Sequence, residues 1–246
     1  MADTRIEVLF PEFCNLFGDS ANIRYLQKTL PNAEFVFTKL NDKPKFLTEK
    51  MNLVYMGPMT ENTQQLVIDR LKPYKKEIKE KIDGGLAFLF TGNALEVLGE
   101  YIDDGEGHKI EAVGLYPYYA KRDMYHRHNS EELVTFGDMQ IMGFKTQFTQ
   151  CYPKDKDFPY LFEIKKGMGM NLDTKGEGWH DHNFMGTYLV GPILTNNPNF
   201  CKYLLELIGE KDAEPAFLEA AKAAYDKRLK DFMDKVADKP AKYHYM

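Results

Sequence analysis

The sequence is short of cysteine and tryptophan, and it has no long apolar run. Among 246 residues there are one tryptophan and three cysteines, Cys14, Cys151 and Cys201. An odd, widely spaced set of cysteines does not form the paired framework of a small secreted domain, so it favours a reducing compartment. No segment approaches the roughly 18 apolar residues of a membrane span, and the charged N-terminus lacks the apolar stretch of a signal peptide. We therefore expect a cytoplasmic protein without a membrane partner.

An excess of positive charge is also missing. Lys and Arg number 32 against 37 Asp and Glu, which gives a formal net charge of −5. A protein that attracts nucleic acid through its overall field carries the opposite sign, so we expect no nucleic-acid partner. Hydrophobic residues make up 43% of the chain, enough for a sizeable core and too many for intrinsic disorder.

The first hundred residues alternate between short apolar runs and helical patterns. The patterns predict strands at 6–10, 34–38, 52–56 and 86–90, and helices at 21–30, from 62 onward with a break at Pro73, and at 94–99. The last of these strands is continuously apolar, which is typical of a strand buried on both faces. The alternation predicts an α/β fold with an open, mostly parallel sheet flanked by helices.

Glycines and aromatic residues interrupt the second half of the chain. We expect extra strands there, at 110–115, 133–136, 140–144, 160–164 and 186–190, attached to the sheet as a meander. Helices at 200–208 and 214–236 follow, and then a loose tail at 237–246. The organisation predicted is one domain over 1–210, with 211–246 as a C-terminal helix and tail packed on it.

The most informative loop follows the buried strand at 86–90 and reads Thr91-Gly92-Asn93. Ligands bind outside the carboxyl ends of parallel strands, and a sharp strand-to-helix turn can hold a nucleophile above the sheet. Thr91 supplies the one hydroxyl of this turn, and it needs a nearby base to be activated. The alternative is an ordinary turn in which Thr91 or Asn93 caps the helix.

Several segments in a fixed order carry a family resemblance. They are 15–23 (NLFGDSANI), Gly143-Phe144, Glu177-Gly178, 186–194 (GTYLVGPIL) and Asn197-Pro198. Together they resemble the cobyric-acid-synthase-like (CobB/CobQ-type) class I glutamine amidotransferases, and most of all their GatD branch, the amidotransferase subunit of lipid II isoglutaminyl synthase. The resemblance implies a flavodoxin-like class I amidotransferase fold with a role in biosynthesis of the peptidoglycan or cobalamin kind. In that family a Cys on the nucleophile turn and a distant His release ammonia from glutamine.

This chain departs from the family at both catalytic positions. Gly92 falls at the position of the family Cys, or Thr91 if the match is shifted by one residue, and Val190 falls at the position of the His. Because such residues act as a unit, losing either one costs several orders of magnitude in rate. We therefore expect a protein without normal glutaminase activity. The alternative is an active amidotransferase or amide hydrolase with Thr91 as a substitute nucleophile; Cys14, after the first strand, is a weaker candidate for that role.

The same resemblance implies ligands and partners. It places a small amino-acid or amide ligand beside Gly57, Asn93, Arg127, Gly143 and Phe144, with Arg127 as a contact to the ligand's carboxylate. It also implies a Mur-ligase-like synthetase as a partner subunit. No cofactor is expected.

Two His-x-His pairs support a different class of function. They are His126-Arg127-His128 and His180-Asp181-His182, and with Asp181 or Glu177 the second pair could bind a divalent metal. A metal-dependent hydrolase is therefore a further alternative. Neither pair matches an established metal signature, so no metal site is expected.

Overall fold

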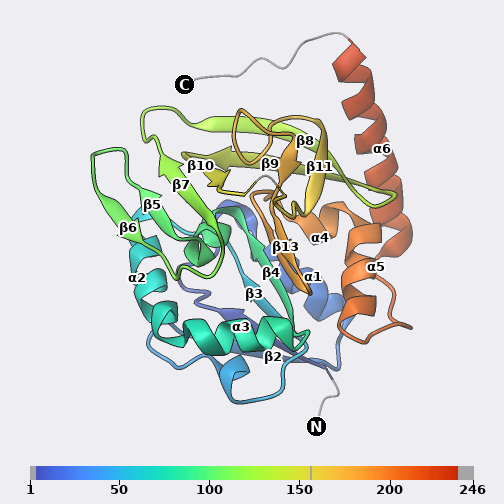
Figure 1. Cartoon of the computed structure of the whole chain (residues 1–246). Helices are drawn as coiled ribbons and strands as arrows, with labels where there is room; N and C mark the ends of the chain where they lie inside the picture. Colours follow the sequence, from blue (N-terminus) through green and yellow to red (C-terminus); the bar gives the residue numbers. More distant parts are fainter. Residues whose placement is uncertain (1–3, 156, 238–246) are drawn as a thin grey trace.

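A six-stranded sheet runs through the middle of the molecule. The computed structural model describes residues 4–155 and 157–237 (Figure 1), and the strand order is β13-β14-β4-β3-β1-β2. Every neighbouring pair is parallel except β13 with β14. This confirms the prediction of an open, mostly parallel sheet. The strands are β1 (Arg5–Leu9), β2 (Glu34–Thr38), β3 (Leu53–Met56), β4 (Ala87–Thr91), β13 (Trp179–Asp181) and β14 (Phe184–Thr187).

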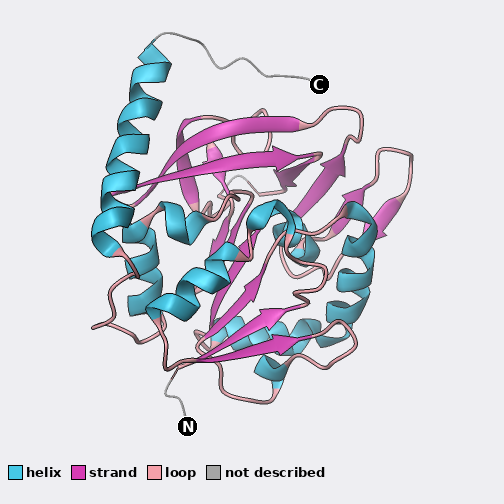
Figure 2. Ribbon diagram, turned by 180° about the vertical axis from the view of Figure 1, so that it is seen from behind, coloured by secondary structure: helices cyan, strands magenta, loops and turns pink. Residues whose placement is uncertain are grey.

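Helices cover both faces of this sheet (Figures 1 and 2). Strand β4 is apolar on both sides and therefore needs cover on both. Its Phe88 and Phe90 belong to one apolar core, and Ala87 and Leu89 to the other. No helix among the described residues has both the length and the apolar composition to cross a membrane. The helices are α1 (Ala21–Thr29), α2 (Glu61–Leu71), α3 (Lys75–Asp83), α4 (Ile193–Asn196), α5 (Pro198–Leu207) and α6 (Leu218–Ala237).

The break expected at Pro73 is confirmed. Helix α2 ends at Leu71, a 3-10 turn covers Lys72–Tyr74, and α3 begins at Lys75. Proline has no N–H for the helical hydrogen bond, and its ring clashes with the preceding turn. The helix expected at 94–99 is instead a 3-10 helix, Gly92–Leu98, which begins directly after β4.

Two four-stranded sheets lie outside the central one. The first has the order β10-β7-β5-β6 and the second β12-β11-β8-β9. Extra strands were expected in this half, but four of these eight strands fall outside the predicted ranges, because runs such as Tyr118–Arg122 are short and mix apolar with charged residues. The strands are β5 (Tyr101–Asp103), β6 (Lys109–Glu111), β7 (Tyr118–Arg122), β8 (His128–Phe136), β9 (Met139–Gln147), β10 (Thr149–Pro153), β11 (Phe162–Lys166) and β12 (Gly176–Glu177).

Helix α6 lies along the second of these outer sheets (Figure 1). Its Tyr225, Leu229 and Phe232 form a small apolar cluster with Leu133 of β8 and Met142 of β9. The Tyr225 hydroxyl also donates a hydrogen bond of 2.8 Å to the carbonyl oxygen of Gln140. The tail predicted at 237–246 lies outside the described residues from 238 onward.

Candidate site at the turn after strand β4

The turn after β4, where the sequence predicted a nucleophile turn, holds a glycine in a left-handed conformation. Gly92 has a φ of +58°, in the left-handed region that glycine adopts without strain. A Cβ atom at Gly92 would lie 2.5 Å from Cβ of Pro58 and 3.3 Å from Cγ1 of Val190. The two positions matched to the family Cys and His therefore lie side by side. No side chain fits at position 92 unless Pro58 moves.

Val190 is held against Gly92 by strand β9. Its N–H donates to the carbonyl oxygen of Phe144 at 2.9 Å, and the Phe144 N–H donates to the Val190 carbonyl at 3.3 Å. This pairing brings the expected Gly143-Phe144 segment to the site. The close packing here also requires a glycine at position 143, because a Cβ at Gly143 would lie 2.4 Å from Cδ2 of Leu189. Val190 itself is buried.

Glu177 holds the segment before Val190. Its carboxylate accepts hydrogen bonds from the Thr187 hydroxyl at 2.7 Å and from the Tyr188 N–H at 2.8 Å. Lys145 Nζ lies 3.6 Å from the same carboxylate, and both side chains are fully buried. The ion pair ties β9 to β12, and the hydrogen bonds of Glu177 extend this link to the segment at the end of β14.

Little space remains above Gly92. The cavity there has a volume of about 40 Å³, and its lining includes Gly92, Glu96, Arg127, Gln147 and Tyr188. One water takes about 30 Å³ of liquid, and ligand pockets usually measure about 300–1,000 Å³. The cavity is therefore too small for a glutamine molecule.

Thr91 lies beside a carboxyl group but away from this cavity. It is fully buried, and its hydroxyl donates a hydrogen bond to Asp19 Oδ2. The Tyr55 hydroxyl donates to the same oxygen, and Asn22 Nδ2 donates to Asp19 Oδ1 at 3.1 Å. Burial raises the pKa of Asp19 to about 6, although these hydrogen bonds oppose the shift. The turn thus has a hydroxyl and a base in contact, but no opening to a substrate.

The remaining predicted ligand residues divide into two groups. Asn93 and Arg127 line the small cavity, yet the Asn93 side chain is already engaged, accepting from the Met59 N–H at 2.9 Å and donating to the Met59 carbonyl at 2.8 Å. The Arg127 guanidinium lies over the Phe148 ring, 4.5 Å from its centroid. Gly57 packs on backbone instead, because a Cβ there would lie 2.6 Å from the carbonyl oxygen of Cys14.

The three cysteines are buried and offer no reactive thiolate. Burial raises the pKa of the Cys14 thiol well above its ordinary value and that of Cys201 to about 12. Cys151 is fully buried in β10, where its Sγ lies 2.9 Å from the Tyr188 hydroxyl oxygen. Because the thiolate is the nucleophilic form, none of the three is prepared for catalysis.

One polar group of this site was not anticipated from the sequence. Glu96, in the 3-10 helix, is fully buried and accepts hydrogen bonds of 2.9 Å from Gln64 Nε2 and from the Tyr188 hydroxyl. Burial raises its pKa to about 7. An acidic residue inside an otherwise apolar run, Ala94–Leu98, is the signal that could have identified it.

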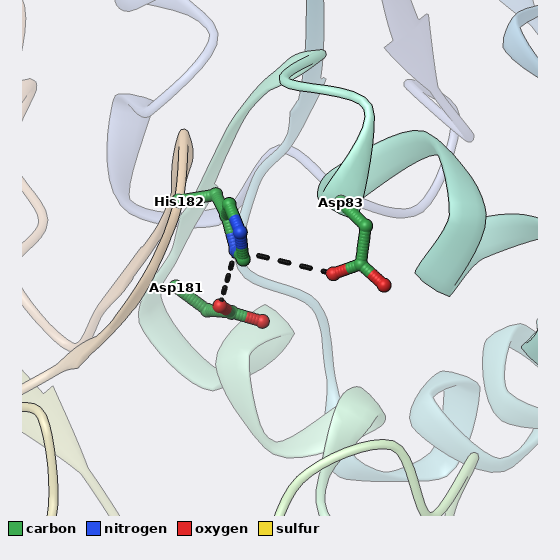
Figure 3. Close-up of side chains that lie close together, drawn as sticks. All are labelled: Asp83, Asp181 and His182. Carbon is green, nitrogen blue, oxygen red and sulfur yellow. Dashed lines mark hydrogen bonds and ion pairs between the residues drawn. The ribbon is translucent and has the colours of Figure 1, made fainter.

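The second His-x-His pair contributes to a polar cluster at the opposite end of the sheet, where β14 begins (Figure 3). His182 Nδ1 lies 2.7 Å from an Asp181 oxygen and 3.9 Å from an Asp83 oxygen. Lys79 Nζ pairs with the carboxylates of both Asp83 and Asp181. The ammonium group therefore already supplies the positive charge that a metal ion would bring. This cluster is the one group of three potential metal ligands within mutual reach among the described residues.

The other histidines considered as metal ligands, and Glu177, contact other groups instead. His126 Nδ1 lies 2.7 Å from Asp123 Oδ2, and His128 Nε2 lies 2.9 Å from Gln150 Nε2. The ring of His180 packs edge-on against Phe136, 5.7 Å between centroids. Glu177 is paired with Lys145 instead.

Comparison with known proteins agrees with this geometry. The family model of the CobB/CobQ-like glutamine amidotransferase domain matches residues 5–198. The GatD subunit of lipid II isoglutaminyl synthase (glutamine-hydrolyzing) from Staphylococcus aureus is 28% identical over 206 residues, 82% of each chain. The same subunit from Streptococcus pneumoniae is 26% identical over 203 residues, 80% of this chain and 77% of that one.

Solved structures show the same fold. A crystal structure of a glutamine amidotransferase superposes with a TM-score of 0.53 at 14% identity, over 82% of this chain and 98% of that chain. A glutamine amidotransferase from Thermotoga maritima gives a TM-score of 0.50 at 14% identity, over 96% and 99%.

Proposed function

The chain belongs to the CobB/CobQ-like glutamine amidotransferase family, and we propose that it is a member without glutamine hydrolysis that acts as a binding subunit. The family resemblance and the class I amidotransferase fold expected from the sequence are confirmed. The observation that carries the proposal is the closure of position 92, where Pro58 and Val190 occupy the place of a side chain.

The chemistry of the family needs three things that this turn lacks. It needs a nucleophile, and Gly92 has no side-chain atom. It needs a proton acceptor beside that nucleophile, and the side chain facing Gly92 is an apolar valine. It also needs room for glutamine, and the cavity measures about 40 Å³. Because nucleophile and base act as a unit, the two losses together remove the covalent step.

The relatives support a role beside a second protein. Both are subunits of a lipid II isoglutaminyl synthase, and this chain matches about four fifths of their length. We infer that this protein likewise binds a Mur-ligase-like synthetase. The synthetase then takes free ammonia, since this subunit supplies none from glutamine.

One observation favours a second candidate, an amide hydrolase that uses Thr91. The Thr91 hydroxyl is bonded to the Asp19 carboxyl group, which is the pairing that activates a hydroxyl nucleophile. Against it stands the complete burial of Thr91.

The first experiment measures glutamate and ammonia after the purified protein is incubated with glutamine. We expect no release above the protein-free blank. Thr91→Val removes the hydroxyl at nearly constant volume, and Thr135→Val in β8 is the matched control. Release that disappears in Thr91→Val and persists in Thr135→Val contradicts the main proposal and supports the second candidate.

The second experiment tests the partner. The protein is mixed with a Mur-ligase-like synthetase from the same source, and complex formation is measured by size-exclusion chromatography with light scattering. The amidation rate is then compared with glutamine and with ammonium chloride as nitrogen donor. We expect a complex that uses ammonium and not glutamine. If the two proteins elute separately, the partner role is contradicted. The proposed loss of glutamine hydrolysis is unaffected by that result, because the first experiment tests it alone.

A further inference from the structure

A much larger cavity lies next to the closed turn. Its volume is about 850 Å³, within the range of small-molecule sites. Its walls come from the outer sheet β10-β7-β5-β6 and the start of β8, and Phe148 separates it from the small cavity by lining both. Its lining includes Lys121 and Arg122 of β7 and Tyr152 of β10.

One wall of the cavity contains Tyr152, the last ring in a row of stacked tyrosines. Tyr101 of β5, Tyr119 of β7 and Tyr152 of β10 stack across neighbouring strands, with ring centroids 5.1 and 5.6 Å apart and ring planes within 13° and 19° of parallel. Strand β10 is the edge of its sheet, so the row ends at Tyr152. Among the described residues no further ring stacks on Tyr152, and the cavity lies beside it. An aromatic face at this place offers a planar ligand a position as the next ring of the row.

A lysine and an arginine of β7 line the cavity, and the lysine lies next to that ring. Lys121 Nζ lies 5.1 Å from the Tyr152 ring centroid, and no carboxylate of the described residues forms an ion pair with it. Arg122 donates from Nη2 to Gln64 Oε1 at 2.8 Å, while its Nε is buried without a hydrogen-bond partner among the described residues. A buried donor without a partner costs stability unless a ligand or water satisfies it.

The carboxylates of the same walls are largely satisfied within the protein. Asp104 accepts from the backbone N–H groups of Glu106 and His108 at 2.8 and 3.0 Å. Asp123 accepts from the Tyr125 N–H at 3.0 Å and lies 2.7 Å from the His126 ring. Glu106, on an exposed turn, is the remaining acid of the wall. The charged side chain that lies directly beside Tyr152 is Lys121.

We propose that this cavity binds a small planar aromatic anion of nucleotide size. The ring stacks on the outer face of Tyr152, and the anionic group pairs with Lys121. The site goes beyond the proposed function, because none of these residues takes part in the closed turn. It is nevertheless connected to that turn: Arg122 bonds to Gln64, and Gln64 bonds to the buried Glu96.

Calorimetric titration of the full chain tests the proposal. The probes are AMP, UMP and flavin mononucleotide, each compared with its neutral form (adenosine, uridine, riboflavin) and with inorganic phosphate. We expect at least one anionic probe to bind saturably at one site, at least tenfold more tightly than both its neutral form and phosphate. Absence of saturable binding by all three overturns the proposal. Equal affinity for a probe and its neutral form, or for a probe and phosphate, also overturns it.

Matched variants locate the site. Tyr152→Leu and Lys121→Gln should each weaken binding about tenfold. Tyr101→Leu and Lys109→Gln are the controls, because Tyr101 stacks on the other side of Tyr119 and Lys109 Nζ lies 4.4 Å from the Tyr101 ring, yet neither residue lines the cavity. Both controls should bind like the parent protein. Equal loss at the two ends of the row overturns the proposed location. If Tyr152→Leu fails to fold, Lys121→Gln against Lys109→Gln carries the same test.

Discussion

Two cavities of this molecule share Phe148 as a wall and differ by more than an order of magnitude in volume, about 40 Å³ against 850 Å³. The smaller one lies at the carboxyl end of the parallel sheet, where this fold places its chemistry, and the side chains around it leave little space. The larger one lies among strands outside that sheet and is lined by aromatic and charged groups. The difference teaches that a turn at the expected place in the fold does not ensure a usable site, because space and side-chain chemistry decide that separately.

The largest expected effect concerns the ion pair behind the closed cavity. Lys145 donates to the carbonyl oxygens of Met168 and Gly169 at 2.6 and 3.0 Å and faces Glu177. Lys145→Met leaves Glu177 as a buried charge without its partner, so we expect a loss of about 3–5 kcal/mol in the free energy of unfolding. Urea denaturation measures it.

The control for that prediction is Lys165→Met. Lys165 pairs with Glu163 at 2.8 Å on the surface, and an exposed pair contributes less than about 1 kcal/mol. If both variants lose the same small amount, the buried pair does not hold the wall of the closed cavity.

The next prediction tests how tightly the turn is closed. Gly92→Ala places a methyl group against Pro58 and Val190 at a positive φ. A left-handed alanine costs about 1–2 kcal/mol and overpacking about 1–3 kcal/mol, so we expect a total loss of about 2–5 kcal/mol by urea denaturation. Gly137→Ala is the matched control, with a φ of +55° and no atom within 4 Å of the added Cβ. Equal losses in the two variants contradict closure by Pro58.

A smaller effect is expected from the pH dependence of stability. Because burial raises the pKa of Glu96 to about 7, the folded protein favours the neutral carboxyl group. The stability contributed by this group is complete below the unfolded pKa of about 4.3 and is lost as the pH rises through 7. One pKa unit corresponds to about 1.4 kcal/mol, so Glu96→Gln should reduce the loss between pH 5 and 8 by about 1–3 kcal/mol.

Comparison of variant with parent isolates Glu96. Asp19 and Glu132 also have raised pKa values, about 6 and about 7, through burial, and both are present in each protein. Urea denaturation at pH 5 and pH 8 provides the four free energies. Glu206→Gln, at an exposed position of α5, should behave like the parent. A Glu96→Gln variant with the same pH profile as the parent contradicts the burial effect.

The smallest expected effect concerns the tyrosine row beside the larger cavity. Tyr101→Leu removes one stacking contact of the tyrosine row, which contributes about 0.5–1.5 kcal/mol beyond the buried area. Tyr125→Leu, at a side chain that is 87% exposed, should change stability by less than about 0.5 kcal/mol. Thermal denaturation compares the two. If they are indistinguishable, the row does not stiffen the cavity wall.

Local patterns were sufficient for the central sheet and for the position of the turn. Strand β2 has the predicted bounds, β1 and β3 agree within one residue at each end, and the break at Pro73 is confirmed. These features depend on neighbours along the chain: alternating burial, a proline without an N–H, a glycine after a buried strand. The outer strands were less predictable, because strands such as β5 and β7 are short and mix apolar with charged residues, so they carry little pattern of their own.

The sequence by itself determined the family, the α/β class and the identity of the residues at the turn, since each depends on which amino acids stand in which order. Only the tertiary structure decided that Pro58 meets Val190 over Gly92, that Glu96 and Lys145 are fully buried, and that three tyrosines from three strands form one stack. The physical reason is that volume and burial are properties of contacts between distant segments. No spacing along the chain specifies how much room those contacts leave.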